Sequence, residues 1–70
     1  MKVIPIKILG VYAGNLWNVV DNDGNYVARV SYIGNKLAAV HGRVPKGAAG
    51  FIERSIEEDS IRRLEEFWRG

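Results

Sequence analysis

The chain contains no cysteine, and histidine and methionine occur once each. The absence of cysteine excludes disulfide crosslinks, thiolate metal sites and a cysteine nucleophile. A single histidine also cannot build a conventional zinc site. A chain of 70 residues without such crosslinks must draw its stability from one compact core, supplemented by self-association.

Long apolar runs and a large excess of one charge are absent as well. No stretch approaches the ~18 apolar residues of a membrane-spanning helix. Pro5 and Lys7 interrupt the apolar start that a signal peptide would need. The 10 Lys and Arg against 8 Asp and Glu give a net charge of +2, too small to demand a nucleic-acid partner. We therefore expect a cytoplasmic protein that has no membrane segment.

The composition and the absence of a linker indicate one domain over residues 1–70. The hydrophobic fraction of 47% and the charged fraction of 26% are typical of a soluble globular protein. Residues 1–50 carry six Lys and Arg against two Asp, whereas residues 51–70 carry four Arg against six Asp and Glu. The hydrophobic patterns predict a β-rich part over residues 1–41, a loop over 42–50 and a helix over about 55–69.

The first strand is predicted from Val3 to Leu9, where apolar residues alternate. Pro5 cannot donate to a strand ladder, which favours an edge position or a strand that begins there. Gly10 and Gly14 flank a second apolar piece and mark a turn, a bend or a bulge.

Two hairpins are predicted in the middle of the chain. The segment 21–25, Asp-Asn-Asp-Gly-Asn, separates two β-prone runs and indicates a turn around Asp23-Gly24. Gly34-Asn35 indicates a second turn, for which a leading glycine favours type II′ geometry. Two-residue loops would place Trp17 opposite Val30. The face shared by both hairpins then holds Trp17, Val19, Ala28, Val30, Tyr32, Leu37 and Ala39.

An alternative register remains open at the first hairpin. A three-residue loop with a bulge at Gly24 would place Leu16 and Val20 on that shared face instead, because a slip of one residue turns every side chain over. In the preferred register the opposite face holds an apolar set that is interrupted by polar residues. The apolar set is Leu16, Val20, Val27, Ile33, Ala38 and Val40, and the interruptions are Asn18, Arg29 and Ser31.

The expected fold class is therefore α+β, a small antiparallel meander of three to five strands packed on one C-terminal helix. One helix covers one face of such a sheet. The other face either mediates self-association or is covered by the N-terminal strands, which would close a small barrel.

The C-terminal helix is predicted from its capping and charge pattern. Ser55 and Glu58 fit a capping box at the N-cap and N3 positions. Ile61, Leu64 and Trp68 form a stripe, widened on one side by Ile56 and Phe67, that we expect to face the sheet. Phe51 and Ile52 fall outside the stripe and are assigned to a separate short turn over the core. The acid-first pairs at i,i+4 are Glu58–Arg62, Asp59–Arg63 and Glu65–Arg69.

These patterns place both tryptophans in the core. Trp17 belongs to the shared sheet face, and Trp68 to the helix stripe. The alternative is that Trp68, close to the end of the chain, is an exposed interface anchor, because tryptophan is enriched at interface hot spots.

Catalytic and metal chemistry is not expected. Asp21, Asp23 and Asn25 have calcium-loop spacing, but Gly24 comes too early and no glutamate closes the loop. A hairpin turn explains them. His41 has no nucleophile in a suitable context. We expect no enzyme activity, no cofactor and no metal.

Two functions are carried forward. The first is a small protein-interaction module that self-associates as a homodimer, with an accessory or inhibitory role such as small proteins of viruses and mobile elements have. Its interface candidates are Leu16, Val20, Val27, Arg29, Ile33, Val40 and Trp68. The alternative is a weak nucleic-acid binder that uses the sheet edge and the loop 42–50. Its contact candidates are Lys7, Arg29, Lys36, Arg43 and Lys46.

Overall fold

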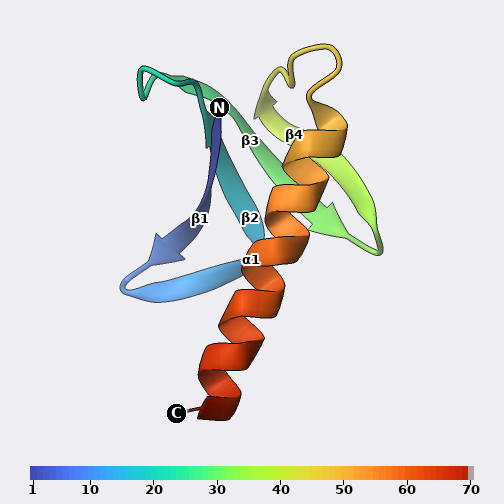
Figure 1. The fold of residues 1–70 in the computed structure, drawn as a ribbon. Helices are drawn as coiled ribbons and strands as arrows, with labels where there is room; N and C mark the ends of the chain where they lie inside the picture. The colour runs from blue at the N-terminus through green and yellow to red at the C-terminus, as the bar shows by residue number, and fades with distance from the viewer. Residues whose placement is uncertain (70) are drawn as a thin grey trace.

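A computed structural model describes residues 1–69 and shows a four-stranded antiparallel sheet with one helix across one face (Figure 1). The strands follow the order β1-β2-β3-β4 in the sheet. This confirms the predicted α+β class, meander and C-terminal helix. The elements are β1 (Lys2–Ile8), β2 (Val11–Val20), β3 (Tyr26–Ile33), β4 (Lys36–Gly42) and α1 (Ala49–Arg69).

The sheet is open, with β1 at one edge and β4 at the other. The edge position of β1 agrees with the presence of Pro5 in this strand. Leu9 and Gly10 form the turn to β2, and their φ angles of 52° and 80° are both positive, as a type I′ turn requires. β2 then continues through Gly14 as one strand. The closed barrel is therefore wrong, because β1 pairs with β2 and leaves the far face of the sheet uncovered.

The hairpin of β2 and β3 combines both registers that the sequence left open. The loop is the three-residue alternative, since the Gly24 amide donates to the Asp21 carbonyl at 3.1 Å and Gly24 has a φ of 85°, which suits a glycine bulge. A second bulge follows between Val19 and Val20. It cancels the one-residue shift, so Trp17 pairs with Val30 and keeps the preferred register.

The hairpin of β3 and β4 confirms the predicted pairing but corrects the turn type. Tyr32 pairs with Leu37, as expected from a two-residue loop. Gly34 and Asn35 have φ angles of 59° and 62°, and two positive values define type I′ rather than the expected type II′. The register shifts again after Val30, so Arg29 pairs with His41.

The helix begins at Ala49, earlier than the predicted start near Ser55. A turn positions it: the Ala48 amide donates to the Pro45 carbonyl at 3.0 Å, and the Ile52 amide then donates to the Ala48 carbonyl at 3.0 Å. Gly47 supplies the positive φ of 82° that the third residue of a type II turn needs. The capping box is therefore wrong, because Ser55 lies inside the helix.

The core is formed by one face of β2 and β3 and by the first turns of α1. Ile52 and Ile56 are 0% and 1% exposed, which corrects the assignment of Ile52 to a separate turn. The Tyr32 hydroxyl donates a hydrogen bond to Glu57 Oε1 at 2.8 Å and links β3 to the helix. The buried residues are Trp17, Val19, Ala28, Val30, Ala48, Ile52 and Ile56.

Candidate functional site

The C-terminal half of α1 carries the largest exposed apolar side chains of the helix. In Figure 1 the last turns of α1 extend beyond the sheet. The prominent exposed residues there are Ile61, Leu64, Phe67 and Trp68, with 58%, 57%, 75% and 77% of their surface accessible. Exposure of this degree in consecutive turns makes a candidate binding surface.

This apolar surface lies on a different side of the helix from the core contacts. At about 100° per residue, Ile61, Leu64 and Trp68 point roughly 120–180° away from Ile52 and roughly 80–140° away from Ile56. We call these three residues the outer stripe. The prediction that the outer stripe faces the sheet is therefore wrong, and the sheet-facing positions belong to Ile52 and Ile56.

The side of α1 that faces the sheet is polar at Asp59 and Arg63, in the two turns after Ile56. Asp59 accepts a hydrogen bond from Arg63 Nη2 at 2.6 Å, which confirms this predicted pair. The Arg63 guanidinium lies 4.6 Å from the centre of the Tyr12 ring and 5.8 Å from that of Trp17. Through these cation–π contacts, Arg63 covers the end of the core. The apolar side chains farther along the helix are not part of the core.

The two tryptophans have opposite environments. Trp17 is 3% exposed, which confirms its core position, whereas Trp68 is 77% exposed. The core position predicted for Trp68 is wrong, and its exposure is what the anchor alternative requires. The Phe67 ring meets the Trp68 ring edge-on, with centroids 5.6 Å apart. The outer stripe thus ends in an exposed aromatic pair.

The far face of the sheet does not present one apolar patch. Cross-strand pairing places Asn18, Arg29 and His41 in one polar row across this face, and Arg29 Nε donates to Asn18 Oδ1 at 3.4 Å. Among the predicted interface residues, Leu16 and Val20 are half-buried beside this row. Val27 packs against the core, and Ile33 and Val40 are exposed at 62% and 56%.

A second exposed apolar cluster lies at the β1–β2 turn, which sequence reasoning missed. Ile8, Leu9 and Val11 are 59%, 99% and 69% exposed. The sequence feature that could have predicted this cluster is Leu9, an apolar residue beside Gly10 in a two-residue turn. A shallow groove lined by Gly14, Leu64 and Phe67 separates this hairpin from the helix. We call the hairpin tip, residues 8–12, and the helix segment 61–69 together the open end of the molecule.

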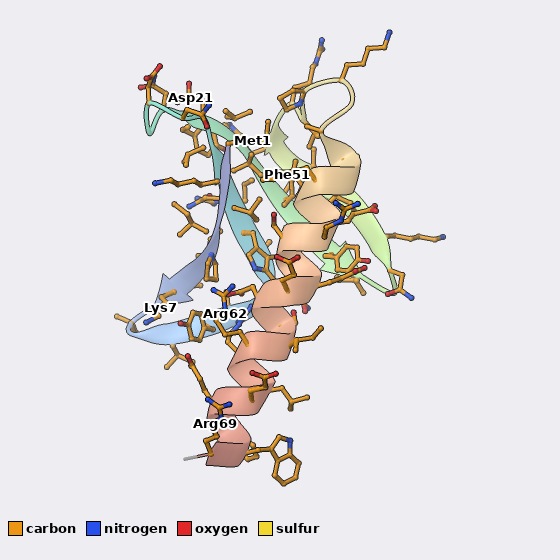
Figure 2. All side chains as sticks on the ribbon, viewed as in Figure 1. Met1, Lys7, Asp21, Phe51, Arg62 and Arg69 are labelled. Carbon is orange, nitrogen blue, oxygen red and sulfur yellow. The ribbon has the colours of Figure 1, made fainter. Side chains whose placement is uncertain are left out.

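The basic residues of the nucleic-acid alternative are not brought together. Lys7 lies in β1 with its ammonium 4.7 Å from the centre of the Tyr12 ring. Arg29 lies on the far sheet face, and Lys36 begins β4 beside its turn. Arg43 and Lys46 belong to the loop before α1. That loop and Lys7 occupy opposite ends of the molecule (Figures 1 and 2).

The polar clusters singled out in the sequence have structural roles. Asp21 Oδ1 accepts the amides of Asp23 and Asn25, each at 2.9 Å. These hydrogen bonds, that of Asn25 above all, lower the pKa of the Asp21 carboxyl, and they confirm the turn interpretation. His41 Nδ1 lies 2.7 Å from the Tyr26 hydroxyl.

Residues 1–69 contain neither a metal-binding cluster nor a membrane-spanning helix. They contain no group of three or more His, Cys, Asp or Glu side chains placed to hold a metal ion. Within the same residues, no helix is both long and apolar enough to span a membrane.

Comparisons with known proteins give no family. No model of a protein family, no curated protein and no solved structure matches this chain.

Proposed function

We propose that this chain is a small protein-binding module that acts by surface complementarity and carries no catalytic site. Its binding surface is the outer stripe. The observation that supports the proposal is that Ile61, Leu64 and Trp68 are each more than half exposed, on a part of the helix that extends beyond the sheet (Figure 1). Contiguous exposed apolar surface of this kind marks interaction sites.

The chemistry of the outer stripe fits recognition of a protein. Its members are spaced three and four residues apart, the spacing of anchor residues in helices that dock onto another protein. Trp68 supplies the residue type most enriched at interface hot spots. A module of this kind, without catalytic residues, suits an accessory or inhibitory role, such as those of small proteins in viruses and mobile elements.

Site-specific photo-crosslinking tests the proposal. A benzoylphenylalanine in place of Leu64 should form covalent protein adducts on irradiation in cells that produce the chain. The same probe in place of Lys36, an exposed residue at the β3–β4 turn, is the matched control and should form none. Adding Trp68→Ala should abolish the adducts at position 64.

Two results would contradict the proposal. One is the absence of any protein adduct at position 64. The other is crosslinking to nucleic acid from position 36 or from Lys46, with retention on DNA that falls steeply as salt is raised. That result would favour the nucleic-acid alternative.

A further inference from the structure

One flank of the outer stripe carries acids and bases in alternation. Glu58, Arg62, Glu65 and Arg69 follow one another at spacings of four, three and four residues, which keeps them within roughly 60° of each other around the helix. Figure 2 shows Arg62 and Arg69 on the same side of α1. Among residues 1–69 the ion pair within the chain joins Asp59 and Arg63, so these four charges have no ionic partner there. We call them the charged flank.

The charged flank is complementary in charge to the same flank on a second copy of α1 that runs in the opposite direction. When two copies of α1 run antiparallel, Glu58 of one copy lies opposite Arg69 of the other, and Arg62 lies opposite Glu65. The contact is then isologous, because each pair occurs twice about a two-fold axis. When the copies run parallel about a two-fold axis, the two charged flanks lie on opposite sides of the helix pair and do not meet.

The outer stripe is compatible with the same arrangement. An axis midway between Arg62 and Glu65 passes beside Leu64, so Leu64 meets its counterpart. Ile61 of one copy then approaches Trp68 of the other. The exposed apolar side chains and the charged flank therefore select the same orientation of the second copy.

The chain exposes more surface than its mass predicts. Its accessible area is 5317 Å², whereas a folded protein of 7.8 kDa is expected to expose about 4,400 Å². A core of seven buried residues without disulfides also gains from the apolar surface that pairing would bury.

We propose that the partner of the outer stripe is a second copy of the chain, whose α1 packs antiparallel against it about a two-fold axis beside Leu64. This inference rests on the proposed function and names its partner. The dimer joins the helices back to back, with each sheet on the outside.

Charge reversal tests the pairing. Sedimentation velocity should show the unmodified chain as a dimer at micromolar concentration. The variant Glu58→Arg/Glu65→Arg makes the charged flank wholly basic, and Arg62→Glu/Arg69→Glu makes it wholly acidic. Each should weaken the dimer by about tenfold or more. An equimolar mixture should form the heterodimer, and the variant with all four reversals should recover the homodimer. Circular dichroism verifies that each variant stays folded.

Single cysteines test the orientation, because the chain has no other thiol. Leu64→Cys lies near the proposed axis and should form an intermolecular disulfide under mild oxidation. Trp68→Cys, also in the outer stripe, should not, since antiparallel pairing separates the two copies of residue 68 by about 13 Å along the helices, beyond the ~7 Å reach of a disulfide. Parallel pairing would crosslink both variants and overturn the orientation.

The outcomes distinguish this inference from the proposed function. A chain that stays monomeric at high concentration, while position 64 still crosslinks to a different protein, overturns self-pairing and leaves the binding function intact. A monomer that forms no protein adduct at position 64 overturns both. Dimerisation that is indifferent to all four charge reversals overturns the antiparallel pairing through the charged flank.

Discussion

The two halves of α1 use their apolar side chains in opposite ways. In the first half, Ile52 and Ile56 are buried against β2 and β3. In the second half, Ile61 and Leu64 are as large and as apolar, yet each is more than half exposed. The difference arises because Ile61 and Leu64 lie on other sides of the helix, whereas the sheet-facing positions after Ile56 are Asp59 and Arg63.

This comparison shows that one helix contributes to the core along its first half and exposes apolar side chains along its second half. Arg63 marks the boundary, since its guanidinium lies over the rings of Tyr12 and Trp17 and ends the core there. Beyond it, burial within the same chain no longer explains the apolar residues. Their spacing of three and four residues on another side of the helix is the reason that we propose a partner for them.

The largest effect is expected from matched isoleucine truncations in the two halves. Ile56→Ala should lower the free energy of unfolding by ~2–5 kcal/mol, because it opens a cavity in the core. Ile61→Ala should change it by less than about 0.5 kcal/mol, as is usual for exposed positions. Urea unfolding followed by circular dichroism, at concentrations below any self-association, measures both. Equal losses would mean that the second half also packs on its own sheet.

A smaller effect, of opposite sign, is expected at the hairpin tip of the open end. Leu9 is 99% exposed and has a φ of 52°, a left-handed conformation that costs a leucine ~1–2 kcal/mol. Leu9→Asn creates the Asn-Gly pair that type I′ turns prefer, and it should stabilise the fold by ~1 kcal/mol. Thermal unfolding measures the gain, with Leu9→Ala as the control that keeps the strain. Destabilisation by asparagine would show that Leu9 makes stabilising contacts.

The hydrogen bond between Tyr32 of β3 and Glu57 of α1 should make the free energy of unfolding depend on pH in the alkaline range. The hydrogen bond from Tyr32 to Glu57 raises the pKa of the Tyr32 hydroxyl above its ordinary value of 10.0. Because the unfolded chain loses this proton first, the contribution is complete below pH 10 and is lost as the pH rises through the folded-state pKa. In Tyr32→Phe, the urea concentration at the midpoint of unfolding should fall less steeply as the pH is raised above 10. Tyr12→Phe, at the open end, should leave the loss associated with Tyr32 unchanged.

The smallest effect is expected at Ser55, inside the packed half of the helix. Ser55→Ala should raise the free energy of unfolding by a few tenths of a kcal/mol, because alanine has the higher helix propensity. Ser60→Ala, farther along α1, should behave alike. Chemical denaturation of both variants measures the difference. A loss of ~1 kcal/mol at Ser55 alone would mean that it caps the helix after all.

Local patterns in the sequence were sufficient for the sheet. Alternation of apolar residues and the positions of the turns predicted that Trp17 pairs with Val30 and Tyr32 with Leu37, and both pairs occur. The loop at Gly24 did not by itself determine that register. The bulge after Val19 restores it, since only then do Ala28 and Val30 lie under the helix.

The local sequence pattern did not predict where α1 begins. The turn at Pro45 and Gly47 continues directly into helix, whereas the sequence offered a plausible cap at Ser55.

Side chains four residues apart are neighbours on any helix, which predicted three ion pairs. Among residues 1–69 the pair Asp59–Arg63 forms, whereas Glu58–Arg62 and Glu65–Arg69 do not.

The sequence by itself determined the α+β class, the order of the elements, the strand pairing and the burial of Trp17, because these follow from short-range periodicity and turn chemistry. Only the tertiary structure decided which apolar side of α1 faces the sheet. A stripe at helical spacing is equally apolar against a core or against solvent. The contact of Arg63 with Tyr12 and Trp17 occupies the sheet-facing side of the helix beyond Ile56. Ile52 and Ile56 are therefore buried, and Ile61, Leu64 and Trp68 are exposed.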